Sequence, residues 1–227
     1  MDASFWHQKW ERGEIGFHES QTNPHLLAHI DKLKLATGAR IFLPLCGKTL
    51  DIAWLLGRGY RIVGAELSAL AIDELFKGLG LQPNIVTNGA LSHYSAHNID
   101  VFVGDIFRLS HDQLGAIDAI YDRAALVALP EALRKHYTTH LMQLGAHAPQ
   151  LLICFVYDQN LLAGPPFSVG DDEVNRHYGA HYDLALLARV EMPVKFKGKA
   201  ATWEHIWLLQ NHRAEPAPVG TPCSATP

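Results

Sequence analysis

The 227-residue chain has few cysteines, little excess charge and no long apolar run, and each shortage excludes a class of protein. Its three cysteines, Cys46, Cys154 and Cys223, share no close spacing, which argues against a disulfide framework or cysteine-rich metal site. A formal charge of −4 gives no reason to expect nucleic acid or an anionic membrane as a partner. No apolar run could span a bilayer, and the N-terminal segment lacks the apolar core of a secretory signal. We therefore expect a soluble cytoplasmic protein.

Histidine, by contrast, is abundant, and four pairs have the spacing of one helical turn. The fourteen histidines include His25/His29, His93/His97, His136/His140 and His177/His181. Such a pair can hold one metal ion, but the helical zinc-protease motif also needs a Glu directly after the first His, which no pair has. His140 shares a helical face with apolar residues such as Tyr137 and Leu141, which favours packing. We predict scattered histidines and no metal site.

Short apolar segments alternate with helical patterns between residues 40 and 158. Strands are expected at 40–45, 60–67, 99–107, 116–122 and 150–158, and helices at 23–38, 49–59, 68–80 and 130–145. This alternation predicts an α/β fold with a mostly parallel sheet, helices on both faces and a ligand site beyond the carboxyl ends of the strands. The segment 150–158 is continuously apolar and so central in the sheet. Segments 187–198 and 202–210 are expected to form an antiparallel pair at one edge.

The stretch "IFLPLCGKTLD", residues 41–51, contains the Gly-Lys-Thr of many nucleotide-phosphate loops. A Walker loop also needs a glycine at position 42, where this chain has Phe42. Pro44 has no N–H, so one donor that could ring a phosphate is missing. The dinucleotide fingerprint G-x-G-x-x-G is absent as well. The turn therefore does not suit a phosphate group.

Glu66 ends the second expected strand, about twenty residues after this turn. A carboxylate at that place in an α/β sheet can accept hydrogen bonds from both hydroxyls of a ribose, although it can equally be a helix-capping or surface group. Combined with a turn that does not suit phosphates, the ribose interpretation favours a nucleoside cofactor without phosphate. S-adenosylmethionine is the common one.

Four blocks of the chain resemble the thiopurine S-methyltransferase family, in the family's order. They are "FWHQKWERGEIGFHE" (5–19), "FLPLCGKTLDIAWLLGRGYRIVGAELS" (42–68), "YDRAALVAL" (121–129) and "YDQNLLAGPPFSV" (157–169). The resemblance implies a Rossmann-like class I methyltransferase fold that uses S-adenosylmethionine. It implies a single domain over 1–211, with an N-terminal lid and helix (1–39), a cofactor-binding core (40–158) and an acceptor loop with C-terminal strands (159–211). Residues 212–227 are expected to be a disordered tail.

The resemblance also implies a role for individual residues at the cofactor. Trp10 would cover it, Leu45 would contact its methionine portion through the backbone, and Glu66 would hold the ribose. Ile106, with Asp105 beside it, would border the adenine. Arg123 would lie at the junction of cofactor and acceptor and orient the acceptor thiolate. Each has a plainer alternative, namely a core anchor for Trp10, packing for Leu45 and Ile106, and a cap or a salt bridge to Asp122 for Arg123.

The acceptor would be bound by Phe17, Pro165 and Phe167, although the prolines can equally be structural. Ala124 stands where the family usually has glycine, a departure that bears on acceptor size. The resemblance implies an S-methyltransferase acting on aromatic or heterocyclic thiols such as thiopurines, with selenium or tellurium compounds as further candidate acceptors. Two alternatives stay open. One is a methyltransferase of the same fold acting on a halide or metalloid oxyanion, and the other is a non-catalytic nucleoside-binding module.

Overall fold

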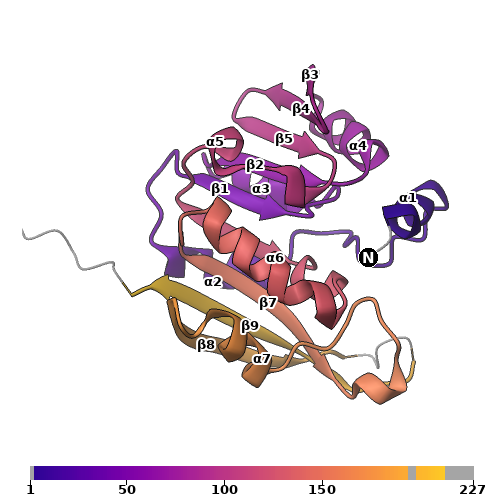
Figure 1. The fold of residues 1–227 in the computed structure, drawn as a ribbon, viewed down its shortest axis with the longest axis vertical. Helices are drawn as coiled ribbons and strands as arrows, with labels where there is room; N and C mark the ends of the chain where they lie inside the picture. Colours follow the sequence, from indigo (N-terminus) through magenta and orange to yellow (C-terminus); the bar gives the residue numbers. More distant parts are fainter. Residues whose placement is uncertain (1–2, 194–197, 213–227) are drawn as a thin grey trace, which may run out of the picture.

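A nine-stranded mixed sheet forms the centre of the protein in a computed structural model that describes residues 3–193 and 198–212 (Figure 1). Its strands are β1 (Arg40–Pro44), β2 (Arg61–Glu66), β3 (Asn84–Asn88), β4 (Leu91–Ala96), β5 (Ile99–Val103), β6 (Ala119–Arg123), β7 (Gln150–Tyr157), β8 (Tyr182–Glu191) and β9 (Thr202–Asn211). Their order across the sheet is β3-β4-β5-β2-β1-β6-β7-β9-β8. The five strands from β5 to β7 are parallel, and the two strands at each end are antiparallel.

Helices cover both faces of this sheet. They are α1 (Ala3–Glu11), α2 (Pro24–His29), α3 (Asp51–Gly57), α4 (Ala69–Leu79), α5 (His111–Leu114), α6 (Glu131–Leu144) and α7 (Asp171–Tyr178), with 3-10 turns η1 (Ile30–Leu33), η2 (Ile106–Arg108), η3 (Leu126–Ala128) and η4 (Gln159–Leu161). Successive residues of β1 point to opposite faces, so Ile41 and Leu43 pack with α2, α3 and α4, whereas Phe42 packs with α5, α6 and α7. The predicted α/β sheet with helices on both faces is thereby confirmed.

Most predicted elements are present, and their ends are set by local chemistry. Asn23 caps α2 by accepting from the N–H of His25 at 2.9 Å, and Ser68 caps α4 by accepting from the N–H of Ala71 at 3.3 Å. The strand predicted at 99–107 is too long, because Gly104, with φ of +139°, turns the chain out of the sheet.

The antiparallel pair predicted at one edge of the sheet is confirmed as β8 and β9, although β8 begins earlier than predicted, at Tyr182. Residues 194–197 of the strand predicted at 187–198, and 213–227 of the predicted tail, lie outside the described residues. The β3–β4 hairpin was not predicted. Every residue of β3 is exposed, so its sequence carries no apolar face that would reveal a strand.

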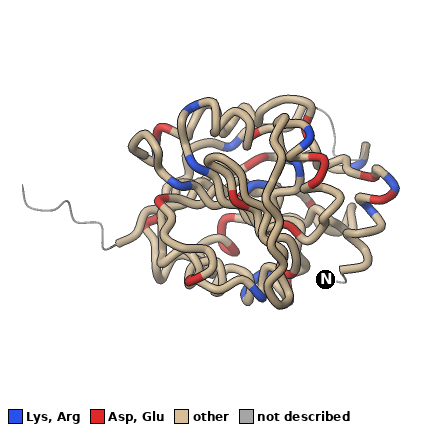
Figure 2. The backbone as a smooth tube through the Cα atoms, turned by 90° about the horizontal axis from the view of Figure 1, so that it is seen from above, with Lys and Arg blue, Asp and Glu red and all other residues tan. Residues whose placement is uncertain are grey.

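Charged residues of both signs are interspersed along the described chain, as the colours of the backbone in Figure 2 show. Among the described helices, none has the length and apolar character needed to cross a bilayer. The described residues also contain no cluster of three or more His, Cys, Asp or Glu side chains that could hold a metal ion. His93 lies on β4 and His97 in the turn after it, so this pair does not share a helical face.

Candidate active site

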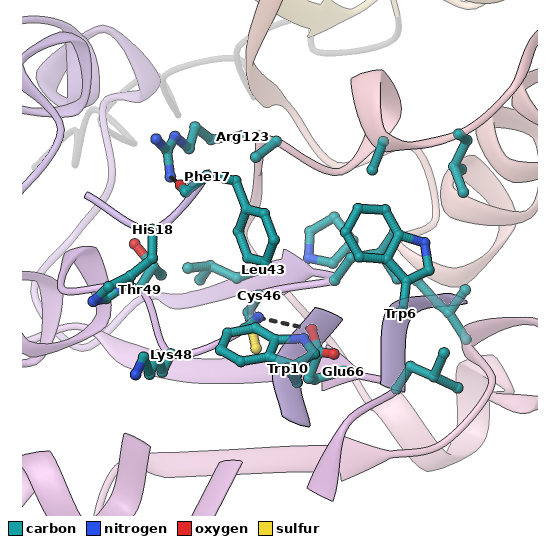
Figure 3. A pocket seen from close by; sticks show the side chains of 18 of the residues that line it. Trp6, Trp10, Phe17, His18, Leu43, Cys46, Lys48, Thr49, Glu66 and Arg123 are labelled. Atoms are coloured by element: carbon teal, nitrogen blue, oxygen red, sulfur yellow. Dashed lines mark hydrogen bonds between the residues drawn. The ribbon is translucent and has the colours of Figure 1, made fainter. Parts of the chain in front are cut away.

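A cavity of about 150 Å³ opens at the carboxyl ends of β1, β2, β5 and β6 (Figure 3). This is where a parallel sheet of this topology places its ligands. Leu45, Glu66, Ile106 and Arg123 line it from the ends of these four strands, and Trp10 lines it from α1. The structure therefore brings all five residues proposed for the cofactor to one cavity.

The turn after β1 uses its N–H groups internally. The N–H of Cys46 donates to the carbonyl of Ala65 at 3.0 Å, and the N–H of Gly47 donates to the Glu66 carboxylate at 2.8 Å. Leu45 and Gly47 have φ values of +46° and +52°, which produce the sharp reversal. Because these donors are already engaged, the turn cannot ring a phosphate, in agreement with the sequence argument.

Glu66 forms the polar floor of the cavity and is buried. One carboxylate oxygen accepts from the N–H of Gly47 and the other accepts from the N–H of Ser68 at 2.9 Å. Burial raises the pKa of Glu66, and these backbone hydrogen bonds oppose the rise. Each oxygen of a carboxylate can accept a second hydrogen bond, so the group suits the two neighbouring hydroxyls of a ribose.

The N-terminal segment covers this floor with aromatic side chains. Trp10 is buried, and its ring lies so close to the Gly47 backbone that a Cβ at position 47 would be 3.0 Å from it. The Phe17 ring meets the rings of Trp10 and Trp6 edge-on, at centroid distances of 5.4 and 5.7 Å. Figure 3 shows the Phe17 ring between Trp10 and Arg123. We call residues 3–23 the N-terminal cover.

Arg123, at the end of β6, is held by this cover. Its guanidinium donates to the carbonyl of Phe17 at 3.2 Å and forms an ion pair with Glu19. The guanidinium side chain is 10% exposed, whereas Glu19 is 37% exposed. The salt bridge to Asp122 that the sequence left open does not form, because Asp122 points into the core and accepts from Tyr137 at 2.8 Å.

A second polar link fixes the cover to the sheet. The Glu19 carboxylate accepts from the Asn23 side chain, and the N–H of Asn23 donates to Asp51 at 2.8 Å. Asp51 also accepts from the hydroxyl of Tyr121 at 3.0 Å. The chain of contacts from Arg123 to Tyr121 joins the cover to β6 at two points, so movement of the cover would disturb the cavity wall.

The far wall of the cavity is made by the loop after β5. The carboxylate of Asp105 accepts from the N–H of Phe107 at 3.0 Å and starts η2, while Ile106 is buried against the core. His140 on α6 hydrogen-bonds the carbonyl of Ile106 at 2.9 Å. The histidine that the sequence assigned to packing therefore also holds the backbone of the expected adenine-binding segment.

Pro165 and Phe167 do not belong to the residues that line the cavity. The Phe167 N–H donates to the carbonyl of Val127 at 2.6 Å, next to Ala128 on the cavity wall. The Phe167 ring lies over Gly164, where an added Cβ would be 2.5 Å from it. Their loop thus supports the wall from behind, and their contact with an acceptor stays a prediction.

Sequence reasoning missed several residues of the site. His18, Lys48, Asp51 and Tyr121 line the cavity, and Glu19 pairs with Arg123. His18 and Glu19 belong to the block "FWHQKWERGEIGFHE", in which the sequence analysis assigned roles only to the aromatic residues Trp10 and Phe17. Tyr121 lies near the end of the strand predicted at 116–122, and Asp51 lies in the first turn of the helix predicted at 49–59, and closeness to the carboxyl ends of strands is the signal that could have identified them.

Ala124 lies in the left-handed region, with φ of +62°, immediately after β6. A Cβ is disfavoured there by about 1–2 kcal/mol, which glycine avoids at some loss of chain entropy. We expect Ala124→Gly to raise the free energy of unfolding by about 0.5–1 kcal/mol in urea denaturation. The matched substitution Ala125→Gly, at a buried residue with φ of −91°, should lower it by a similar amount. Equal destabilisation by both would contradict a strain at Ala124.

Asp122 gives the fold a dependence on pH. Burial raises the pKa of Asp122 to about 6, although hydrogen bonds from Leu126 and Tyr137 oppose the rise. The folded protein binds this proton more tightly than the unfolded chain does. The stabilisation that protonated Asp122 contributes is therefore complete below pH 4 and is lost as pH rises through about 6. The loss amounts to about 3 kcal/mol. We expect Asp122→Asn to remove most of this decline, measured as the free energy of unfolding at pH 4 and 7. A variant that declines like the wild-type protein would contradict the assignment.

Solved structures of similar fold include S-adenosylmethionine-dependent methyltransferases. The 1,6-didemethyltoxoflavin-N1-methyltransferase of Burkholderia thailandensis, solved with S-adenosylhomocysteine, has a TM-score of 0.62 at 14% identity, over 92% of this chain and 87% of that one. A methyltransferase from Anabaena variabilis has a TM-score of 0.59 at 15% identity, over 92% and 94%. The overall fold is therefore that of class I S-adenosylmethionine-dependent methyltransferases.

Within this class, the chain belongs to the thiopurine S-methyltransferase family, whose sequence profile matches residues 1–212. A relative named thiopurine S-methyltransferase from Xanthobacter autotrophicus is 52% identical over 92% of this chain and 99% of its own length. Another of that name from Teredinibacter turnerae is 49% identical over 93% and 99%. The family resemblance read from the four blocks is confirmed, and the protein is an enzyme that uses S-adenosylmethionine.

Proposed function

We propose that this enzyme methylates the sulfur of aromatic or heterocyclic thiols such as thiopurines. The observation that supports this acceptor class is the composition of the cavity, which is lined by the rings of Trp6, Trp10 and Phe17 and by a cation, Arg123. Flat rings stack on such side chains, and a cation favours the thiolate over the thiol. Relatives named for thiopurine methylation support the same class.

The residues of the cavity fit the cofactor. Glu66 has acceptor capacity for the ribose hydroxyls, the loop at Ile106 offers an apolar wall for the adenine, and the backbone around Leu45 lies where the methionine portion would extend. When bound, S-adenosylmethionine supplies a methyl group on a positively charged sulfur. The protein has to place the acceptor sulfur in line with that methyl group and exclude water, and such positioning can contribute about 7–11 kcal/mol at best.

The cover carries out much of this positioning. Trp10 and Phe17 close the cavity above the turn, and the enclosed volume of about 150 Å³ is smaller than the roughly 300–1,000 Å³ of typical ligand pockets. We infer that the cover shifts to admit the ligands and closes over them. The ion pair between Arg123 and Glu19 would couple that closure to the acceptor end of the cavity.

The direct test is methyl transfer from labelled S-adenosylmethionine to 6-mercaptopurine, with thiophenol and selenite in parallel. Transfer to the two thiols is the expected result, and transfer to selenite would extend the acceptors to selenium compounds. Tellurite can be tested in the same way. Cofactor binding without transfer to either thiol would overturn the proposal and favour a halide or oxyanion acceptor or a non-catalytic binding module.

A cytoplasmic location stays a prediction from the composition, and a monomeric state stays part of the methyltransferase hypothesis. Light scattering of the purified protein tests the monomeric state. The same composition gives no reason to expect nucleic acid or a membrane as partner.

A further inference from the structure

An acceptor that enters the closed cavity as a thiol must lose its proton there. Aromatic thiols of low pKa arrive largely as thiolates and need no base, whereas thiols of higher pKa keep the proton near neutral pH. Because the cover excludes bulk water, a group of the cavity wall has to take that proton. This question rests on the proposed function, since it concerns the same sulfur acceptor.

The carboxylates that line the cavity are poorly suited to this task, because each is already bound by the protein. Asp51 accepts from the Asn23 N–H and the Tyr121 hydroxyl, Glu66 accepts from the N–H groups of Gly47 and Ser68, and Asp105 accepts from the N–H of Phe107. These hydrogen bonds occupy carboxylate oxygens that would otherwise face the acceptor thiol. Glu66 would in addition be occupied by the ribose.

The remaining titratable groups of the wall are protonated at neutral pH. Burial raises the pKa of Cys46 and of Tyr121 well above their ordinary values. Lys48 pairs with Glu74 at 2.5 Å and Arg123 pairs with Glu19, and an ammonium or guanidinium group offers hydrogen-bond donors but no acceptor. Neither the buried thiol and phenol nor the two cations can accept a proton near pH 7.

His18 differs from all of these. It lies on the cover beside Phe17, lines the cavity, and its N–H donates to the carbonyl of Ile15 at 2.8 Å, which anchors the backbone. Within the described part of the chain, its ring makes no hydrogen bond to the protein. Figure 3 shows it between Arg123 and Lys48. The imidazole thus has a lone pair available at the acceptor end of the cavity.

The charged groups around His18 come from three elements besides the cover itself. Partial burial is the largest of the causes that lower the pKa of His18. Lys48 in the turn after β1 and Arg123 at the end of β6 lower this pKa further, whereas Glu74 on α4 raises it. Glu19 follows it in the chain and pairs with Arg123. A lowered pKa keeps the imidazole neutral, and so able to accept a proton, across the neutral pH range.

We propose that His18 is the general base for thiol acceptors that are protonated at neutral pH. As the acceptor sulfur forms its bond to the methyl carbon, the bond from that carbon to the cofactor sulfur breaks and its electron pair stays on the departing sulfur. The S–H proton passes to the His18 ring and from there to solvent when the cover opens. The neighbouring cations make the imidazolium short-lived, which favours this release. The acceptor range thereby extends beyond thiols that ionise on their own.

The test compares His18→Gln with the wild-type enzyme on two thiols at pH 7. Benzyl mercaptan is largely protonated at this pH, and 4-nitrothiophenol is largely ionised. We expect kcat/KM for benzyl mercaptan to fall by about 10²-fold, the usual contribution of a general base, while that for 4-nitrothiophenol changes by less than about threefold. With benzyl mercaptan, the wild-type rate should stay level around neutral pH and fall only where His18 becomes protonated, whereas the rate of the variant should fall across the neutral range with the thiolate fraction of the acceptor. With 4-nitrothiophenol, the two profiles should coincide.

Three controls separate this role from a structural one. His97→Gln, at an exposed histidine outside the cavity, should leave both rates unchanged. Affinity for S-adenosylhomocysteine and the unfolding temperature should be unchanged in His18→Gln, and His18→Asn serves as a second variant if the first does not fold. Equal losses on both thiols, or a wild-type enzyme that methylates 4-nitrothiophenol but not benzyl mercaptan, would overturn the role of His18. Failure of the wild-type enzyme on every thiol would overturn the proposed function instead.

Discussion

Replacing Glu66 by alanine should weaken binding of S-adenosylhomocysteine by about 3–6 kcal/mol, or about 10²–10⁴-fold in dissociation constant. Two contributions add to this value. A carboxylate that accepts from both ribose hydroxyls contributes about 1.5–3 kcal/mol for each hydrogen bond. Its loss also leaves the N–H groups of Gly47 and Ser68 without their acceptor, which loosens the turn that would face the ligand.

Titration calorimetry with two ligands distinguishes the ribose contribution from the loosened turn. S-adenosylhomocysteine and its 2′-deoxy analogue differ by one hydroxyl, so the wild-type enzyme should prefer the former and Glu66→Ala should bind both alike. The control Asp112→Ala, at an exposed carboxylate outside the cavity, should keep the wild-type preference. A variant that retains the full preference for the ribose diol would remove Glu66 from the ribose site.

The sheet and the position of Glu66 could be predicted because both follow from local pattern. The parallel strands have continuous apolar runs, and in this topology the carboxyl ends of the strands border the ligand site, so a carboxylate at a strand end is expected there. The β3–β4 hairpin could not be predicted, since β3 buries none of its residues and its pairing with β4 is set by neighbours in space.

The site residues at the strand ends could be predicted from the sequence, whereas the contacts of the N-terminal cover could not. Leu45, Glu66, Ile106 and Arg123 follow strands whose order fixes where they meet. The ion pair between Arg123 and Glu19 joins positions 104 apart, and no periodicity in the sequence encodes a contact over such a distance. The sequence offered Asp122, the nearest acid, as the partner of Arg123, and backbone direction excludes it because successive strand residues face opposite sides.

Arg123→Ala should lower kcat/KM for anionic thiols such as 4-nitrothiophenol by about 10²–10³-fold, which is the usual effect of removing a charged donor from a closed site. The guanidinium has five N–H donors, and its contacts with Phe17 and Glu19 leave others for the acceptor. Transfer to an acceptor without charge should fall less, because it gains nothing from the cation. Arg123→Lys keeps the charge but loses the planar fork, and we expect an intermediate rate.

Glu19→Gln tests whether the charge of Arg123 acts on the acceptor or only holds the cover. The substitution keeps the shape of the side chain and an oxygen for Asn23, but it removes the negative charge that neutralises Arg123. If Arg123 acts on the acceptor, its cation is less shielded in this variant, and KM for 4-nitrothiophenol should fall while KM for benzyl mercaptan stays the same. Steady-state kinetics at low and high salt provide a second check, since the added attraction is screened by salt. An equal loss of activity on both thiols in Arg123→Ala and Glu19→Gln would instead assign the pair to closure of the cover.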